Sequence, residues 1–296
     1  MQRRLCHVFM TPLAIVLASL AAMPATAQSA NPASANPAIP ESSYADVADL
    51  AVTANTIIDA RIRRVSPVPP ETVPNLPPQL VRLYVEAEVN TVLFGRDPVA
   101  RRVGFLVDQP RRADGRAPRI KGTRVLLFAR PVTQSNRLLL ITPSAMLGWD
   151  AARDATVRSI IGELARTAAP PRVTGVGQLF HVPGSIPGES ETQIFLRTES
   201  GDPVSLSILR RPGESPRWAV AFGEIVDESA TVPQRRTLGW YRLACGLPAE
   251  LPPASLAAMP GADARAAAED YALVMRALGS CDRSANPAVL AVAPQR

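Results

Sequence analysis

The sequence contains one lysine, two histidines and three cysteines among its 296 residues, and these scarcities exclude several kinds of chemistry. The residue three positions before Lys121 is a proline, so the Ser-x-x-Lys motif of some serine acyl-transfer enzymes is absent. After the N-terminal segment, the only histidine and cysteines are His181, Cys245 and Cys281. A tetrahedral metal site needs four ligands, so these three residues cannot complete one. There is no Walker loop and no Gly-x-Gly-x-x-Gly between a strand and a helix. We therefore expect neither a metal site nor a cofactor.

The N-terminus has the three-part layout of a secretory signal peptide. Arg3 and Arg4 precede an apolar run over residues 9–23, and an Ala-Thr-Ala sequence ends at Ala27. The run is shorter than the ~20 residues needed to span a bilayer, and a proline interrupts it. The pattern predicts a signal peptide over residues 1–27 with cleavage near Ala27. We expect a mature chain without a transmembrane segment that is periplasmic or secreted.

Arginine carries nearly all of the positive charge. The chain has 32 basic against 26 acidic residues, and loss of the signal peptide lowers the net charge from +6 to +4. This mild excess fits recognition of anions by planar guanidinium groups, and it also fits the amino-acid usage of a GC-rich genome.

Both ends of the mature chain have compositions that resist folding. The pentapeptide Ser-Ala-Asn-Pro-Ala occurs twice within residues 28–43 and again at residues 284–288. Such stretches cannot bury enough apolar surface to offset the entropy lost on ordering. We expect a disordered linker over residues 28–43 and a disordered tail over residues 284–296.

Residues 44–148 have the two-residue alternation of apolar and polar side chains that is typical of half-buried strands. Five strands are predicted, at residues 58–63, 82–89, 102–108, 123–131 and 137–142. Five strands with a long first connection fit a five-stranded OB-like β-barrel domain over residues 44–148.

The segment VRLYVEAEVNTVLFG followed by IKGTRVLLFARPV resembles netrin/TIMP-like OB barrels, in which a strand ends at an apolar-apolar-Gly corner and a Gly-x-x-x-Leu-Leu-Phe strand closes the sheet. The resemblance covers about a third of the chain and implies an OB-like fold there. Those domains depend on an N-terminal cysteine and disulfides that this segment lacks, so it implies no inhibitor function. The whole chain also resembles uncharacterised exported proteins of GC-rich Gram-negative bacteria, which implies no activity.

Residues 149–283 predict an α+β domain. A helix begins after Asp150, which is a suitable N-cap, and ends before Pro170. Four strands follow, at residues 172–180, 192–199, 204–211 and 217–224. Short turn-forming links join the later strands, so an antiparallel meander is the economical topology. Two helices, over residues 233–246 and 262–279, complete this domain. For the whole chain we therefore predict a mainly β fold of the α+β type.

Cys245 and Cys281 are the two cysteines of the predicted mature chain, and each lies at the end of a predicted helix. An even number of cysteines in an exported protein favours a disulfide. The pattern predicts a bridge between them.

The segment HVPGSIPGESET gathers the chemically capable side chains His181, Ser185, Glu189 and Glu191. A general base needs a nucleophile or an orienting carboxylate within hydrogen-bond reach. The segment lacks the Gly-x-Ser-x-Gly elbow, and its two Pro-Gly pairs impose turns. We expect an exposed connection with a partly solvated His181, and a hydrolase that uses this histidine with a nearby serine or carboxylate is the alternative.

Two groups of basic residues are candidates for binding phosphate or anionic lipid head groups, as clustered arginines do. They are Arg101 and Arg102, and Arg111, Arg112, Arg116 and Arg119. Because aromatic residues are not interleaved with them, we do not expect nucleic acid as a partner. The leading interpretation is a non-catalytic periplasmic or secreted protein that interacts with another protein or an envelope component, in an oligomeric state that the sequence leaves open. A binder of anionic surfaces is a further alternative.

Overall fold

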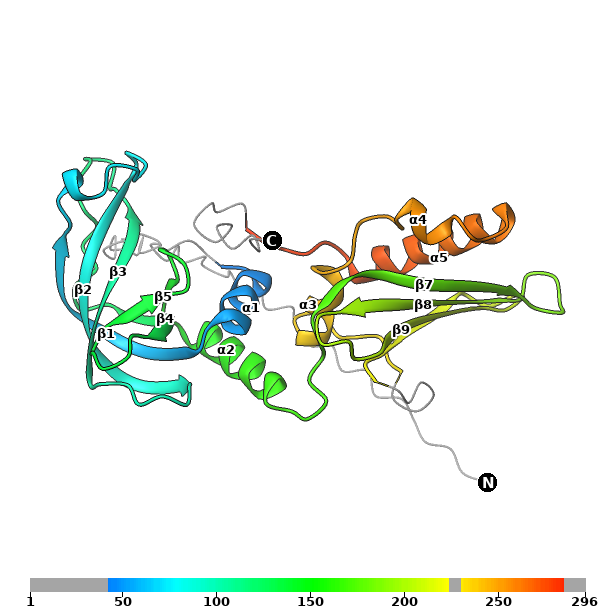
Figure 1. The fold of residues 1–296 in the computed structure, drawn as a ribbon, viewed down its shortest axis with the longest axis horizontal. Coiled ribbons are helices and arrows are strands. Elements are labelled where there is room, and N and C mark those ends of the chain that lie inside the picture. The colour runs from blue at the N-terminus through cyan, green and yellow to red at the C-terminus, as the bar shows by residue number, and fades with distance from the viewer. Residues whose placement is uncertain (1–41, 224–229, 285–296) are drawn as a thin grey trace, which may run out of the picture. The chain divides into compact units, whose positions relative to one another are not determined.

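The structure is a computed structural model that describes residues 42–223 and 230–284 (Figure 1). This part of the chain is mainly β and forms two antiparallel sheets, of six and four strands, with a few helices. The predicted mainly-β, α+β class is therefore confirmed. The predicted signal peptide, its cleavage near Ala27, and most of the linker and of the tail lie outside the described residues.

The described part begins with a helix that the sequence pattern did not predict. Helix α1 spans Tyr44–Thr53, where we expected the β pattern to start, and that expectation is wrong for these ten residues. Ser43 and Asp46 form a capping box, because the Ser43 hydroxyl accepts from the Asp46 amide at 3.1 Å and the Asp46 carboxylate accepts from the Ser43 amide at 2.9 Å. The box satisfies amides that would otherwise lack partners in the first turn, so it favours the helix.

The six-stranded sheet contains the five strands predicted between residues 58 and 142, and one more. Its strands are β1 Thr56–Pro67, β2 Leu80–Phe94, β3 Arg102–Pro110, β4 Arg124–Pro131, β5 Leu138–Leu140 and β6 Met146–Gly148, with the 3-10 helix η1 Pro70–Thr72 between the first two. The order is β3-β2-β1-β4-β5, and β6 also pairs with β4. An isolated parallel bridge joins Gly104 of β3 to Arg137, which directly precedes β5.

Strand β2 shows why the alternating pattern predicts this sheet. Val81, Leu83 and Val85 are buried, whereas Arg82 and Tyr84 between them lie on the other face and are half-buried. Strand β1 departs from the alternation, because five consecutive residues from Thr56 to Ala60 are buried. One of those five is an aspartate.

Asp59 is a buried carboxylate, 1% exposed, held by two neighbouring strands. Its Oδ1 accepts from the Nε of Arg124 and the Nδ2 of Asn90, both at 2.9 Å, and its Oδ2 accepts from Nη2 of Arg124 at 2.7 Å. The Arg124 guanidinium also lies over the ring of Trp149, 3.6 Å from its centroid. Burial alone would raise the pKa of Asp59, but the hydrogen bonds from Arg124 and Asn90 outweigh it and lower the pKa.

This lowered pKa gives the stability a pH dependence. An aspartate has a pKa of about 3.9 in an unfolded chain, so ionised Asp59 stabilises the fold above that pH. The stabilisation is lost as the pH falls through the lower pKa of the folded state. In the Asp59→Asn variant, we expect the free energy of unfolding to decrease less steeply below about pH 4 than in the wild type. Urea denaturation at several pH values measures this slope. The exposed Asp114 provides the control, and equal slopes in Asp59→Asn and wild type would contradict the assignment.

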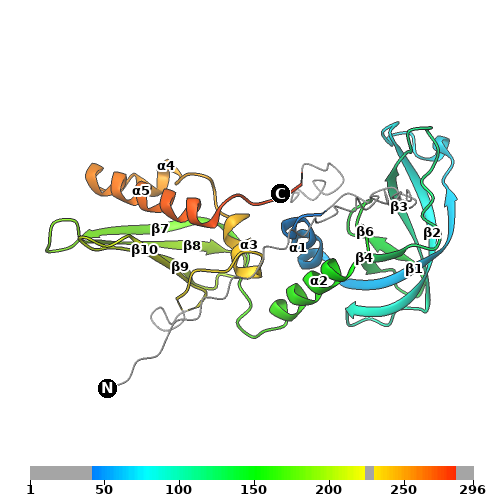
Figure 2. The same cartoon turned by 180° about the vertical axis from the view of Figure 1, so that it is seen from behind.

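The second sheet is the predicted antiparallel meander, in the order β10-β9-β8-β7. Its strands are β7 Val173–Pro183, β8 Ser190–Thr198, β9 Val204–Arg210 and β10 Arg217–Ala221. The helices are α2 Ala151–Leu164, α3 Leu238–Ala244, α4 Pro253–Leu256 and α5 Gly261–Leu278, of which α4 was not predicted. Helix α5 runs along this sheet in both views (Figures 1 and 2).

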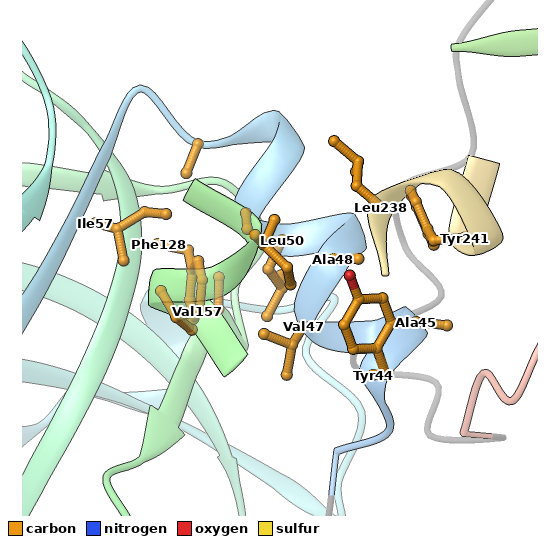
Figure 3. Close-up of a cluster of buried hydrophobic side chains, with 14 of the residues drawn as sticks. Tyr44, Ala45, Val47, Ala48, Leu50, Ile57, Phe128, Val157, Leu238 and Tyr241 are labelled. Carbon is orange, nitrogen blue, oxygen red and sulfur yellow. The ribbon is translucent and has the colours of Figure 1, made fainter. Parts of the chain in front are cut away.

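Figure 3 shows the buried cluster around α1. Val47 and Leu50 of α1, Val157 of α2 and Leu238 of α3 are each at most 2% exposed. Tyr241 of α3 is buried as well, and its hydroxyl donates to the Asp49 carboxylate at 2.5 Å. The three helices therefore share one apolar core, and a charged hydrogen bond joins α1 to α3 at its edge.

Candidate functional site

His181 lies within strand β7 and not in an open connection. It pairs with Thr192 of β8, and the turn between the two strands is limited to residues 184–189. The residue as a whole has intermediate exposure, but its side chain is only 6% exposed, so the imidazole is more buried than we expected. The physical reason is strand alternation, which turns His181 and Leu179 toward the face that α5 covers and Phe180 toward the opposite face.

Three residues from three other elements surround this histidine. The Nδ1 atom of His181 lies 2.8 Å from Oγ1 of Thr192, and that hydroxyl donates to Oδ2 of Asp270 on α5 at 2.5 Å. The other carboxylate oxygen, Oδ1, accepts from Nε of Arg210 on β9 at 2.6 Å. Thr192 and Asp270 are fully buried, whereas the Arg210 side chain is 32% exposed. We call these four residues the histidine network.

The proton arrangement in the histidine network follows from the hydroxyl. Thr192 has one hydroxyl proton, which it donates to Asp270, so its oxygen accepts the hydrogen bond with His181. His181 therefore carries a proton on Nδ1. The Thr192 oxygen is held by two partners inside the structure, which is the arrangement of a satisfied buried polar group that links α5 to the sheet.

The structure does not bring the predicted partners of His181 to the imidazole. Ser185 and Glu189 lie in the turn, and the Glu189 side chain folds over Gly184. Glu191 neighbours Thr192 on β8, so its side chain lies on the opposite face of the sheet, where its carboxylate accepts from Nε2 of Gln193 at 3.0 Å. The sequence missed Arg210 and Asp270 as partners, because no local spacing links them to His181.

The sheet face opposite α5 exposes four large apolar side chains. Phe180 and Val182 of β7 are 54% and 62% exposed, and Phe195 of β8 and Leu209 of β9 are 38% and 39% exposed. The rings of Phe180 and Phe195 meet edge to face, with centroids 6.1 Å apart. We call these four residues the apolar sheet face. Neighbouring exposed apolar side chains of this kind mark surfaces that bind other molecules.

The predicted basic loops do not form one patch. Arg102 begins β3 and Arg111 follows its last residue, so the strand separates them by roughly 30 Å at about 3.3 Å per residue. Arg111 holds two loops together, because its side chain donates to the carbonyls of Pro78 at 3.2 Å and Gly115 at 3.1 Å.

The other basic candidates differ in their partners. Arg112 forms an ion pair with Asp114 at 3.4 Å, and Arg101 forms one with Glu88 at 3.2 Å. In the ranges that the structure describes, the side chains of Arg102, Arg116 and Arg119 have no ion pair. These three guanidinium groups are therefore available for an external anion.

A hollow of about 510 Å³ lies at the N-termini of α1 and α2, and no residue of the histidine network lines it. Two of its lining side chains already cap helices. Ser43 accepts from the Asp46 amide, and Asp150 accepts from the Arg153 amide at 2.7 Å. Asp150 is thus confirmed as the N-cap of α2, and the Ser43 and Asp150 side chains in the hollow already have partners.

Cys245 and Cys281 form the predicted disulfide, with their Cα atoms 5.0 Å apart. Among residues 42–223 and 230–284, no three histidine, cysteine, aspartate or glutamate side chains are placed to hold a metal ion together. Within the same ranges, no helix has both the length and the apolar character needed to cross a membrane.

Comparison with known proteins finds no family model that matches this chain and no matching relative among curated proteins.

Proposed function

We propose that this protein is a non-catalytic interaction protein that is exported and acts in the cell envelope or outside the cell. The observation that carries the proposal is the apolar sheet face, in which Phe180, Val182, Phe195 and Leu209 stay exposed on a rigid four-stranded sheet. A sheet that buries one face under α5 and leaves aromatic side chains on the other, beside Glu191 and Gln193, offers a preformed surface for a partner with both apolar and polar groups. The disulfide is compatible with an oxidising compartment.

The histidine network supports the non-catalytic interpretation over the hydrolase alternative. A base must reach a nucleophile or a substrate, and the His181 side chain is 6% exposed and engaged with Thr192. The Thr192 hydroxyl is fully buried, so it is out of reach of a substrate in solution. A structural role for the network accounts for all of these contacts.

We also propose that the six-stranded sheet curls into an OB-like barrel. The order β3-β2-β1-β4-β5 places β3 and β5 at the two ends of the sheet, and the parallel bridge between Gly104 and Arg137 brings these ends together. Two hydrogen bonds support the closure, from the Gly104 amide to the Asn136 carbonyl at 3.0 Å and from the Asp108 amide to the Pro143 carbonyl at 2.6 Å. Curling of this kind is how small barrels remove exposed sheet edges.

The interaction proposal predicts position-dependent cross-linking in cells. A photoreactive amino acid at position 180 or 195 should give a discrete cross-linked product with an envelope or extracellular protein, because these positions face outward on the apolar sheet face. The same group at Val132, which is 42% exposed and directly follows β4 of the other sheet, is the matched control and should give no such product. Mass spectrometry of the product identifies the partner.

Two results would contradict the proposal. One is the absence of any product at positions 180 and 195 when the protein is present in its native compartment. The other is a hydrolytic activity of the purified protein that His181→Ala removes while the melting temperature stays unchanged.

A further inference from the structure

The outward face of the six-stranded sheet carries arginines from four neighbouring strands and loops. Strand register places Arg61 of β1 beside Glu88 of β2, and Glu88 beside Arg102 of β3. A second row lies next to it, in which Arg64 pairs with Glu86, Glu86 pairs with Gly104, and Gly104 is bridged to Arg137. We call the exposed arginines of these rows and their neighbours the arginine strip: Arg61, Arg63, Arg64, Arg101, Arg102 and Arg137.

The arginine strip has more positive charge than its carboxylates neutralise. Glu88 accepts from Arg63 at 2.7 Å and from Arg101 at 3.2 Å, and these hydrogen bonds lower its pKa. Arg64 is only loosely paired with Glu86, at 3.9 Å. In the described part of the chain, neither Arg102 nor Arg137 forms an ion pair. The strip therefore presents Arg102, Arg137 and the loosely paired Arg64 to an external anion.

The arrangement of these groups fits a surface of many phosphates better than a single bound anion. The arginines are distributed over a sheet whose strands lie about 4.8 Å apart, so the strip is extended and does not converge on one point. Guanidinium groups bind phosphate through paired hydrogen bonds. An extended row of them can contact several head groups at once.

Two exposed leucines beside the strip point to lipid. Leu106 of β3 and Leu139 of β5 are 49% and 62% exposed, and each lies two residues beyond a member of the Gly104–Arg137 bridge. They therefore share the outward face with the arginines. Aliphatic side chains beside basic ones suit the boundary between lipid head groups and acyl chains, whereas stacking on nucleic-acid bases requires aromatic side chains.

We propose that the arginine strip, with Leu106 and Leu139, docks this protein on the surface of a membrane that contains anionic phospholipid. The surface differs from the apolar sheet face, which belongs to the other sheet, so this proposal does not depend on the interaction partner proposed above. It needs no membrane-spanning segment, because the contact is with head groups and the outermost part of the acyl chains.

The test is vesicle binding by the mature protein, with vesicles of equimolar phosphatidylglycerol and phosphatidylcholine and with vesicles of phosphatidylcholine alone. We expect binding to the anionic vesicles only, and weaker binding as the salt concentration rises. The triple variant Arg64→Gln, Arg102→Gln, Arg137→Gln should bind about 100-fold more weakly, since each surface arginine contributes roughly a fivefold factor. Leu106→Ser with Leu139→Ser should weaken binding about tenfold.

A second triple variant, with the same change of net charge but outside the strip, tests whether the position of the arginines matters. Arg166, Arg197 and Arg211 are exposed and lie outside the strip, and their replacement by glutamine should leave vesicle binding within about twofold of wild type. Equal losses in both triple variants would overturn the proposal, because net charge alone would then explain binding. Tighter binding to a single-stranded oligonucleotide than to anionic vesicles would also overturn it and indicate nucleic acid. Thermal unfolding checks that each variant folds.

Discussion

Replacing Asp270 by alanine is expected to lower the free energy of unfolding by about 3 kcal/mol, because removal of one partner from a buried ion pair leaves the other without compensation. Asp270 is fully buried and accepts hydrogen bonds from Thr192 and Arg210. Without it, the Thr192 hydroxyl loses its acceptor and the Arg210 guanidinium loses its counter-charge. We place the effect at the low end of the range for such pairs because the Arg210 side chain is 32% exposed and can turn toward water.

The measurement is thermal unfolding, in which about 3 kcal/mol corresponds to a fall in melting temperature of roughly 6 to 12 °C for a domain of this size. Glu269, the preceding residue on α5, is exposed and provides the matched control. Glu269→Ala should change the free energy of unfolding by at most about 0.5 kcal/mol, as is usual for exposed positions. Similar losses in both variants would show that α5 tolerates no alanine here and would contradict a specific role for Asp270.

The contrast between these adjacent residues shows what the sequence can predict about the histidine network. The pairing of His181 with Thr192 follows from a local feature, since the two Pro-Gly turns reverse the chain between them. Asp270 lies 78 residues beyond Thr192, on a helix whose placement depends on tertiary packing. Its sequence neighbourhood offers two consecutive acidic residues, and burial alone distinguishes them. No local spacing could therefore identify Asp270 as the partner.

The fold was easier to predict where one face of an element is buried and the other is not. Strands β2 and β8 alternate clearly, so their positions follow from the two-residue period. Helix α1 was missed because most of its residues are buried, which removes the contrast between its faces. A local signal was nevertheless present, since Ser43 and Asp46 have the spacing of a capping box. The short helix α4 carries no side-chain cap and gave no such signal.

The arginine strip is another feature that could not be predicted from the sequence. Its members are spread from Arg61 to Arg137, and they meet because strand register places Arg61, Glu88 and Arg102 side by side. The sequence singled out Arg101 and Arg102, which are adjacent in the chain, but it did not link them to Arg61 or Arg137. Charge along a sheet is organised across the strands, so a patch of this kind can be recognised only when the register is known.

Replacing both Cys245 and Cys281 by serine is expected to lower the free energy of unfolding by about 4 kcal/mol, the chain-entropy value for a loop of this length. The bridge closes a segment in which the two cysteines are 36 residues apart. Removing it lets the unfolded chain sample conformations that the crosslink forbids. The melting temperature should fall by roughly 8 to 16 °C, and a reducing agent should lower the wild-type value but leave that of the double variant unchanged.

The disulfide also lies beside a charged contact that should respond to its loss. Arg283, two residues beyond Cys281, donates to both carboxylate oxygens of Asp49 on α1, at 2.7 and 2.9 Å, and Tyr241 donates to the same carboxylate. With the bridge intact, the segment around Arg283 is tied to Cys245 at the end of α3, and α3 contacts α1 through Tyr241, so forming this ion pair orders few further groups. Without the bridge, the ion pair has to hold that segment itself. Asp49→Asn should therefore change the free energy of unfolding by different amounts in the wild-type and serine backgrounds, with a coupling of at least about 0.5 kcal/mol. Strict additivity would mean that the disulfide and the ion pair stabilise independent parts of the chain.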